Sequence, residues 1–280
     1  MHDFGGHEFS RRALLAPMSG RPLLMAIINA TPDSFHKSSR DGGIEEGISH
    51  FAAGADWVDI GGESTRPGSL PITIEEELAR VIPLVEELSK HGPISIDTRN
   101  HQVAKAAIDA GAKMINDVSG LRDPLMFDLV LQSGVAVCIM HMQNTPEEMQ
   151  KSPHYHDVCQ QVSTELLKTA RRLVAAGHPR ELICLDPGIG FGKELTHNIE
   201  LLQGFESLRG TEGFSLLWGV SRKTMIGQIC DQDDSEDRLA GSLGVAAYAQ
   251  LKGIDILRVH DVREHADFAA VMSRLLEVEK

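Results

Sequence analysis

Short apolar runs alternate along this chain with longer segments in which apolar residues recur every three or four positions. The first pattern is typical of buried strands, and the second is typical of helices that pack on them. Regular alternation of the two predicts βα units built around a parallel sheet. The predicted strands are residues 23–29, 57–61, 94–97, 114–117, 136–140, 182–186, 216–219 and 256–259.

Helical segments separate these strands one by one. The clearest is residues 73–90, where Thr73 and Glu76 have the spacing of a capping box ahead of an apolar stripe. Roughly eight βα units in 280 residues predict a single (β/α)8 barrel, domain 1–280, in which residues 1–22 form an N-terminal extension. The predicted helices are residues 44–53, 73–90, 101–110, 125–132, 156–176, 196–208, 236–252 and 262–276.

Composition narrows the choice of partners and compartment. The net charge of −13 disfavours binding to nucleic acid or to an anionic membrane surface. No apolar run approaches the roughly 20 residues that cross a bilayer. The cysteines lie far apart without a C-x-x-C pair, so a disulfide framework or a zinc site is not expected, and the pattern fits a reducing cytoplasm. An acidic protein can still bind a small anion where its basic residues gather.

Polar or charged residues close most of the predicted strands. In a parallel barrel the carboxyl ends of the strands meet at one mouth, where the βα loops build the active site. A chain that ends strand after strand on such residues is therefore predicted to carry a site at this mouth. The residues concerned are Asn29, Asp97, Asn116, Asp117, His141, Asp186, Arg258 and His260.

Further loops carry groups suited to an anion. Residues 61–68 follow the second strand with two glycines, Thr65 and Arg66, which suit phosphate oxygens unless the segment is only a solvated turn. The loops after strands seven and eight often hold phosphate in such barrels. Here these two loops supply hydroxyl and basic groups from Ser221, Arg222, Lys223, Arg258 and His260.

Residues 186–193 superficially match a phosphate-binding P-loop. The match fails because Pro187 stands where the first glycine is required and Glu194 replaces the hydroxyl residue after Lys193. What remains is a strand-end carboxylate followed by a glycine-rich loop. His141 has no second histidine at ligand spacing on its element, so packing or pocket lining is a better interpretation than a metal site.

Taken together, these segments resemble the dihydropteroate synthase family of folate biosynthesis. The resemblance covers nearly the whole chain after about residue 22. It is carried in order by NATPDSF (29–35), GGESTRPG (61–68), IDT (96–98), INDV (115–118), MHMQ (140–143), DPGIGFGK (186–193), SRK (221–223) and RVHDV (258–262). It implies a (β/α)8 barrel and a homodimer that joins 6-hydroxymethyl-7,8-dihydropterin diphosphate to p-aminobenzoate. The products would be 7,8-dihydropteroate and pyrophosphate, and sulfonamides would compete for the p-aminobenzoate site.

The resemblance also implies roles for individual residues. The implied catalytic residues are Asp97, Asp186, Lys223, Arg258 and His260. The implied pterin site comprises Asp97, Asn116, Met140, Asp186, Gly219, Lys223 and Arg258. The implied diphosphate site comprises Asn29, Thr65, Arg66, Ser221, Arg258 and His260, with Asn29 as the ligand of a bridging Mg²⁺. The implied p-aminobenzoate site comprises Asp33, Phe35, Thr65, Pro67, Phe191, Lys223 and Thr224.

One segment departs from the family pattern. The usual Ser-Asp-Gly-Gly after the first-loop Phe is replaced by residues 36–43, HKSSRDGG, which we predict to be a mobile loop ahead of a short helix. Because loops at the mouth commonly carry specificity, we expect an altered KM for p-aminobenzoate rather than loss of the chemistry.

Three other functions fit parts of this pattern. A pterin-dependent methyltransferase domain shares the barrel but needs a corrinoid partner. An aldolase could use Lys223 at a strand end as a Schiff-base nucleophile. A non-enzymatic pterin-binding paralogue would keep the pocket and lose turnover, although the intact set of acidic and basic site residues argues against it.

Overall fold

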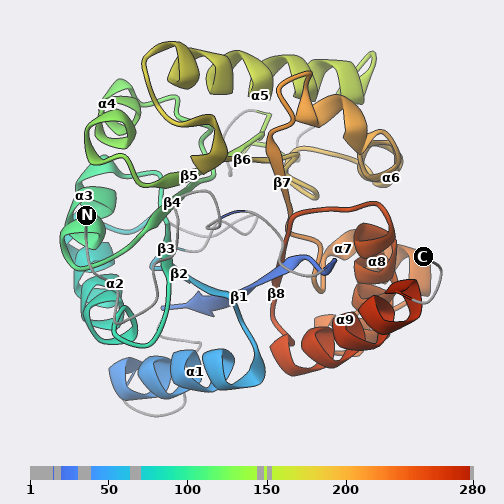
Figure 1. Cartoon of the computed structure of the whole chain (residues 1–280), viewed down its shortest axis with the longest axis horizontal. Coiled ribbons are helices and arrows are strands. Elements are labelled where there is room, and N and C mark those ends of the chain that lie inside the picture. The colour runs from blue at the N-terminus through green and yellow to red at the C-terminus, as the bar shows by residue number, and fades with distance from the viewer. Residues whose placement is uncertain are drawn as a thin grey trace.

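Eight parallel strands close into a barrel whose strand order follows the chain from β1 to β8 (Figure 1). The computed structural model describes residues 15, 20–30, 39–63, 71–143, 148–149 and 153–277. The closed barrel confirms the predicted (β/α)8 fold, and each predicted strand lies within one residue of its expected bounds. The strands are β1 (Leu23–Asn29), β2 (Trp57–Gly61), β3 (Ile94–Asp97), β4 (Met114–Asp117), β5 (Ala136–Met140), β6 (Ile183–Asp186), β7 (Ser215–Trp218) and β8 (Ile256–Val259).

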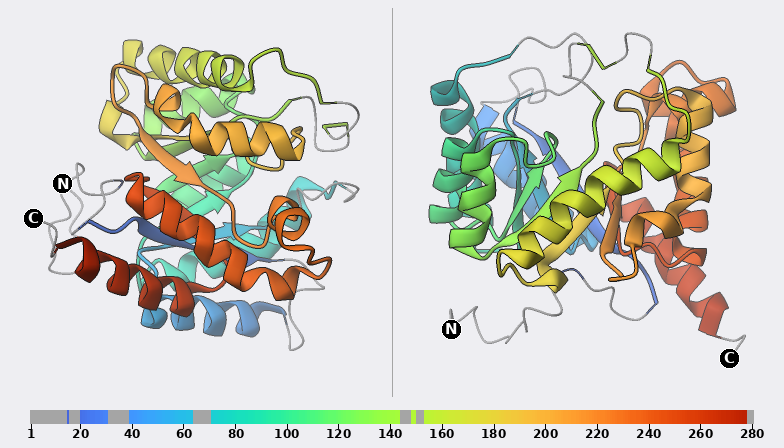
Figure 2. Two further views of the ribbon diagram at one scale, coloured as in Figure 1. Left: turned by 90° about the vertical axis from the view of Figure 1, so that its right-hand side faces the viewer. Right: turned by 90° about the horizontal axis from the view of Figure 1, so that it is seen from above.

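Helices surround the barrel and cover its outer face (Figures 1 and 2). Thr73 caps α2 as predicted, because its hydroxyl accepts a hydrogen bond from the backbone N–H of Glu76. The helices are α1 (Ser39–Ala53), α2 (Ile74–Leu88), α3 (His101–Asp109), α4 (Pro124–Ser133), α5 (Val158–Ala175), α6 (Leu195–Gln203), α7 (Thr224–Cys230), α8 (Leu239–Leu251) and α9 (Val262–Glu277). Short 3-10 turns occupy Arg180–Leu182, Phe205–Arg209 and Ser235–Arg238.

The first helix corrects the predicted loop over residues 36–43. Helix α1 begins at Ser39, so that residues 39–43 are helical and the helix is 15 residues long rather than short. Residues 36–38 lie outside the described part of the chain. Further along the helix, a Cβ at Gly47 would press against the Leu88 side chain of α2. The loop-like composition of residues 39–43 is therefore compatible with the first turn of a helix.

Two other stretches differ from the prediction by more than three residues. The predicted helix over residues 196–208 is divided into α6 and a 3-10 turn at Gly204, where a Cβ would overlap the Cys159 sulfur of α5. Helix α7 lies in a segment for which no element was predicted, directly after Lys223. These differences leave the order of the eight strands in the barrel unchanged.

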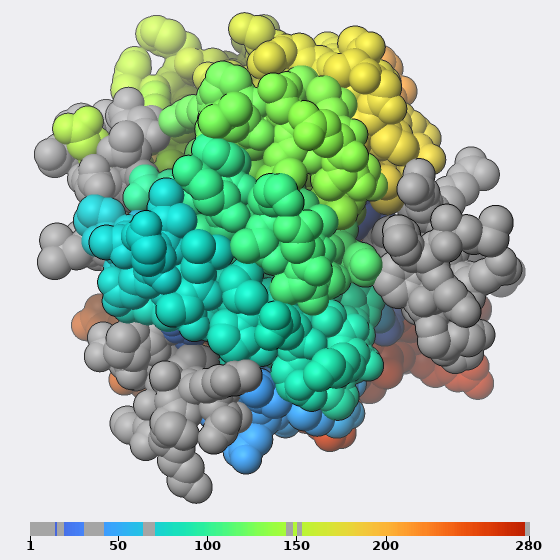
Figure 3. Space-filling view, turned by 90° about the vertical axis from the view of Figure 1, so that its left-hand side faces the viewer, coloured from blue at the N-terminus to red at the C-terminus, as the bar shows by residue number. Residues whose placement is uncertain are grey.

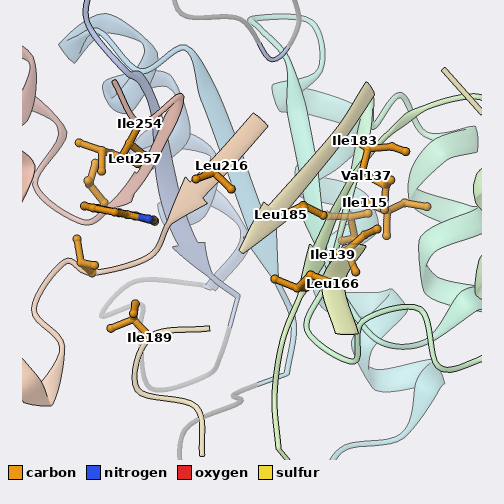
Figure 4. Packing of buried hydrophobic residues seen from close by; sticks show 14 of the residues in the cluster. Ile115, Val137, Ile139, Leu166, Ile183, Leu185, Ile189, Leu216, Ile254 and Leu257 are labelled. Carbon is orange, nitrogen blue, oxygen red and sulfur yellow. The ribbon is translucent and has the colours of Figure 1, made fainter. Parts of the chain in front are cut away.

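Alternate residues of each strand face opposite sides of the barrel wall. The outward-facing set, which includes Ile115, Ile139 and Leu185, packs against the helices in one large apolar cluster (Figure 4). Figure 3 shows the outer surface that α2, α3 and α4 form over this cluster. A separate apolar cluster, which includes Leu15, fills the barrel interior near the amino ends of the strands. Polar side chains that point into the barrel are therefore found near the carboxyl ends of the strands.

Within the described ranges, none of the helices combines the length and the apolar character that a membrane span requires.

Acidic side chains tie the amino ends of neighbouring strands together. Asp255 accepts hydrogen bonds from the Leu216 N–H at 2.8 Å and from Arg209 Nη1 at 2.6 Å. Asp56 accepts from the Leu24 N–H at 2.8 Å in the same way. Each acid thus fixes the start of a strand to its neighbour.

Removal of one of these ties should destabilise the barrel measurably. Asp255→Ala should lower the free energy of unfolding by roughly 1–3 kcal/mol, because it removes two hydrogen bonds to a charged acceptor. Urea denaturation of the variant and the parent measures this difference. Asp109→Ala is the matched control, since it breaks an exposed ion pair with Lys105 and should cost no more than about 0.5 kcal/mol. An equal loss in the two variants would contradict the tie between β7 and β8.

Candidate active site

Polar residues at the carboxyl ends of the strands converge on one deep pocket in the barrel mouth. Most of the strand-end residues expected to share a cavity border this pocket or the cleft above it, but Asp117 and His141 border neither. Its lining residues are Asp97, Asn116, Val118, Met140, Asp186, Ile189, Phe191, Gly219, Lys223 and Arg258. A wider cleft of about 1400 Å³ opens above it and shares several of these residues. The cleft also includes Asn29, Ser221, Thr224 and His260.

Arg258 on β8 is held between two acidic residues in the barrel interior. Its Nε lies 2.6 Å from Asp59 Oδ2, and its Nη2 lies 2.8 Å from Asp97 Oδ2. Burial alone would lower the pKa of the Arg258 guanidinium, but the charges of Asp59 and Asp97 outweigh it and raise the pKa above its usual value. The arginine is therefore permanently charged at the floor of the pocket.

Burial raises the pKa of Asp97 to about 7, although the Arg258 charge opposes this shift. The negative charges of Asp59, Glu77 and Asp117 contribute to the increase. Asp97 thus changes its charge near neutral pH. A ligand that donates hydrogen bonds to this carboxylate favours the ionised form.

Asp186 ends β6 and begins the glycine-rich loop over residues 186–193. Its Oδ1 accepts a hydrogen bond from the Gly188 N–H at 2.7 Å, which aims the other oxygen toward Gly219. Burial raises the pKa of the carboxyl, while the Gly188 N–H, Lys223 and Lys193 oppose the increase. The result is a buried acceptor between two lysines.

Lys193 fixes the shape of this loop from within. Its Nζ lies 3.0 Å from the Gly188 carbonyl oxygen, 2.9 Å from the Phe191 carbonyl oxygen and 3.1 Å from His141 Nδ1. Burial lowers the pKa of the ammonium to about 7, with Asp186 opposing this shift. A Cβ at Gly188, whose φ is +66°, would overlap the His141 carbonyl oxygen. The loop therefore requires glycine for its close approach to β5 and an ammonium for its curvature.

Phe191 is presented to the pocket by the same loop. The Lys223 ammonium lies 4.2 Å from the centre of the Phe191 ring, within the range of a cation–π contact. The loop on either side of Phe191 is held by the Tyr155 hydroxyl, which donates to the Gly192 carbonyl oxygen at 2.9 Å, and by Asn198, which accepts from the Gly190 N–H at 2.8 Å. An aromatic face and an ammonium thus stand together at the pocket rim.

The loops after β7 and β8 are joined by Ser221. Its hydroxyl lies 3.2 Å from the backbone nitrogen of His260 and 3.2 Å from His260 Nδ1. The sequence predicts that Arg222 contributes positive charge for an anion. In the structure its guanidinium is ion-paired with Asp261 and Glu236, which offset that charge. Of the described basic residues, Lys223 and Arg258 border the deep pocket, and Arg258 is itself paired with Asp59 and Asp97.

Some predicted site residues cannot be placed. Asp33, Phe35, Thr65, Arg66 and Pro67 lie outside the described residues, so their predicted roles stay predictions. Asp117 is described, but it turns away from the pocket and accepts hydrogen bonds from the N–H groups of Ser119 and Leu121. It stabilises the turn after β4.

Sequence reasoning missed two residues of this site. Asp59 lies in the middle of β2 rather than at its end, although an acidic residue inside an otherwise apolar strand was a visible signal. From the sequence, Lys193 stands out only as the lysine of an incomplete P-loop match. Its burial, with 4% of the residue exposed, is the observation that reveals its role.

Asn29 ends β1 at the mouth and is half-buried. Among the described ranges of the chain, no group of three or more His, Cys, Asp or Glu side chains is arranged to hold a metal ion. A Mg²⁺ ion characteristically takes one or two protein ligands and completes its shell with substrate phosphates and water. A single carboxamide oxygen at the edge of the cleft fits an ion of that kind.

Known proteins resemble this barrel over nearly its whole length. Residues 25–260 match the family described as "Pterin binding enzyme". The dihydropteroate synthase of Escherichia coli strain K12 is 40% identical over 265 residues, which cover 92% of this chain and 93% of that protein.

Two solved structures extend the likeness to three dimensions. The Burkholderia cenocepacia dihydropteroate synthase complexed with 7,8-dihydropteroate has a TM-score of 0.85 and 41% identity, covering 92% of this chain and 93% of that one. The Yersinia pestis enzyme in a sulfonamide drug complex has a TM-score of 0.87 and 38% identity, covering 93% and 96%.

The arrangement of Lys193 predicts how the glycine-rich loop responds to its loss. In Lys193→Met the amide hydrogens of Gly188, Gly190 and Phe191 should exchange at least about tenfold faster, because a charged donor to several carbonyls is removed and the loop opens locally. Hydrogen–deuterium exchange with mass spectrometry of this segment measures the effect. Lys105→Met on exposed α3 is the control and should leave the segment unchanged. Unchanged exchange in Lys193→Met would show that the loop holds its shape without the ammonium.

Proposed function

Because the chain belongs to the dihydropteroate synthase family of pterin-binding enzymes, we propose that its barrel mouth joins 6-hydroxymethyl-7,8-dihydropterin diphosphate to p-aminobenzoate. The enzyme is a transferase, and the products are 7,8-dihydropteroate and pyrophosphate. The observation that carries the residue assignment is the single pocket in which Asp97, Asn116 and Asp186 face Lys223 and Arg258. The family assignment favours this reaction over a methyltransferase or an aldolase on the same barrel.

The pocket has the polarity that a pterin requires. The amino-pyrimidine edge of a pterin is rich in hydrogen-bond donors, and the buried oxygens of Asp97, Asn116 and Asp186 are acceptors. Lys223 supplies the donor for the pterin carbonyl oxygen. Met140 and Gly219 line the faces of the ring, since both border the same pocket. Buried acceptors of this kind reject analogues that lack the donors, because the acceptors would be left without partners.

The diphosphate lies above the pterin, in the wider cleft. Arg258 and His260 supply positive or donating groups, and the Ser221 hydroxyl lies beside His260. Arg66 and Thr65 from the loop after β2 are proposed to complete this site. Asn29 would hold Mg²⁺ by its carboxamide oxygen, and the bound ion would supply positive charge that stabilises the leaving diphosphate. The ion is therefore expected to bind with the substrate rather than to stay resident.

Phe191, Lys223 and Thr224 are proposed to contact p-aminobenzoate at the pocket rim. The Phe191 ring offers an aromatic face to the arene, and the Lys223 ammonium beside it favours a carboxylate. Asp33, Phe35, Thr65 and Pro67 are proposed to close over the arene from the two loops that carry them. Sulfonamides are expected to compete at this position.

The chemistry follows from where the charges lie. As the carbon–oxygen bond of the diphosphate ester breaks, its electron pair leaves with pyrophosphate and positive charge develops on the pterin. Ionised Asp97 and Asp186 stabilise that charge from a buried, preorganised position. The arylamine is largely neutral at pH 7, so its nitrogen attacks the exocyclic carbon directly, and the resulting ammonium loses one proton to solvent. The substitution is therefore dissociative at carbon.

We also infer a homodimer in the cytoplasm. Apolar side chains on α8 and α9 are exposed, among them Leu251, Val271 and Leu275, and they offer a surface for a second copy. All four cysteines are free thiols, which suits a reducing compartment.

One assay tests the reaction and its central carboxylate. The parent should release pyrophosphate from the pterin diphosphate when p-aminobenzoate and Mg²⁺ are present. Release should be lost without Mg²⁺, and formation of 7,8-dihydropteroate should be lost without p-aminobenzoate. Asp97→Asn should lower kcat by an amount equivalent to roughly 2–4 kcal/mol of transition-state stabilisation. Asp109→Asn, on the exposed face of α3, is the control. A parent that binds the pterin without turnover would identify a non-enzymatic paralogue, and a near-parental kcat in Asp97→Asn would remove this residue from the mechanism.

The bond that breaks can be identified separately. Substrate labelled with oxygen-18 at the bridge between the pterin methylene and the diphosphate should yield labelled pyrophosphate, because cleavage is at the carbon–oxygen bond. Mass spectrometry of both products measures the label. Its absence from pyrophosphate would instead indicate attack at phosphorus.

A further inference from the structure

We propose that Asp59 is a positioning residue that sets the polarity of the pterin site from beneath its floor, by orienting the Asn116 amide and the Arg258 guanidinium. This inference rests on the proposed function for the identity of the ligand. The geometry around Asp59 is independent of that identity.

Asp59 reaches two site residues across the barrel interior. It is fully buried in the middle of β2, and it borders neither the deep pocket nor the wider cleft. Its Oδ2 accepts from Arg258 Nε at 2.6 Å and from Asn116 Nδ2 at 3.0 Å. These partners lie on β8 and β4, and in each direction one strand stands between them and β2. One oxygen atom thus links two walls of the pocket.

The bond to Asn116 decides which end of its amide faces the ligand. Because Nδ2 donates to Asp59, the carbonyl oxygen Oδ1 is the end left for the pocket. A pterin edge that consists of donors requires an acceptor at this place. A reversed amide would turn two N–H donors toward the ligand. Asp59 therefore makes Asn116 an acceptor, like its neighbours Asp97 and Asp186.

The hydrogen bond between Asp59 and Arg258 determines which N–H groups of the guanidinium remain for Asp97. With Nε on Asp59 and Nη2 on Asp97, the guanidinium is held at two points, and the fork geometry fixes its plane. Loss of Asp59 would leave Asp97 as the one acidic hydrogen-bond partner of Arg258 among the described residues. Arg258 would then compete with the pterin for the Asp97 carboxylate.

The charges that face Asp97 make a pH-dependent test available. These groups are Arg258 on β8, Asp59 on β2, Glu77 on α2 and Asp117 on β4, while Asp186 and Lys223 border the same pocket. Asp59 and the other acids raise the pKa of Asp97, and Arg258 opposes them. Removal of the Asp59 charge should therefore lower the pKa of Asp97, and the ionised carboxylate should persist to more acidic pH.

The test compares Asp59→Asn with Asp56→Asn. Asp56 directly precedes β2 in the sequence. Like Asp59, it is paired with an arginine, Arg21, but it lies at the opposite end of the barrel. In Asp59→Asn the KM for the pterin diphosphate should rise at least about tenfold, with the KM for p-aminobenzoate unchanged within about twofold. The acid limb of kcat/KM should move to lower pH by at least about half a unit. Asp56→Asn should change none of these.

A carbon-13 NMR titration of the aspartate side chains gives a readout that does not need turnover. The titration midpoint of Asp97 should fall in Asp59→Asn and stay unchanged in Asp56→Asn. Asp59→Glu, which keeps the charge but displaces it, should raise the KM for the pterin diphosphate without lowering that midpoint, and it serves if Asp59→Asn does not fold. An unmoved midpoint, or equal changes in both KM values, would overturn the positioning role. A parent with no pyrophosphate release would overturn the proposed function alone.

Discussion

A buried arginine between two aspartates is the constraint on which the barrel mouth depends. Arg258 is charged in the interior, and Asp59 and Asp97 compensate that charge. A buried ion pair requires good geometry, because its desolvation cost is large and the loss of one partner leaves an uncompensated charge. The neighbouring strands must therefore hold these three residues in a narrow range of positions. The same precision then serves a ligand that is recognised by its hydrogen bonds.

The rest of the fold maintains that geometry. Apolar residues fill the barrel near the amino ends of the strands, so the polar residues have a rigid base. Lys193 and Tyr155 hold the glycine-rich loop, and Ser221 joins the loops after β7 and β8. Preorganised donors and acceptors of this kind stabilise developing charge without reorganising during the reaction. The barrel thus contributes to catalysis mainly by holding the polar groups of the mouth in fixed positions.

The strand order and much of the site could be predicted from the sequence, because period and strand ends are local features. Asp97, Asn116 and Asp186 stand where a strand ends, so parallel topology alone places them together. Asp59 could not be found in this way, since its importance comes from contacts with residues 57 and 199 positions away. The start of α1 differs from the prediction because residues 39–43 have the polar, glycine-containing composition of a loop and nevertheless form the first turn of the helix.

The raised pKa of Asp97 makes the stability of the folded protein depend on pH. Because burial favours the protonated carboxyl in the folded state, Asp97 contributes stability below about pH 4 that is lost as the pH rises through about 7. Donors from a bound heterocycle favour the ionised form. We infer that a heterocycle donating to Asp97 would offset the stability that ionisation of this buried carboxyl removes as the pH rises.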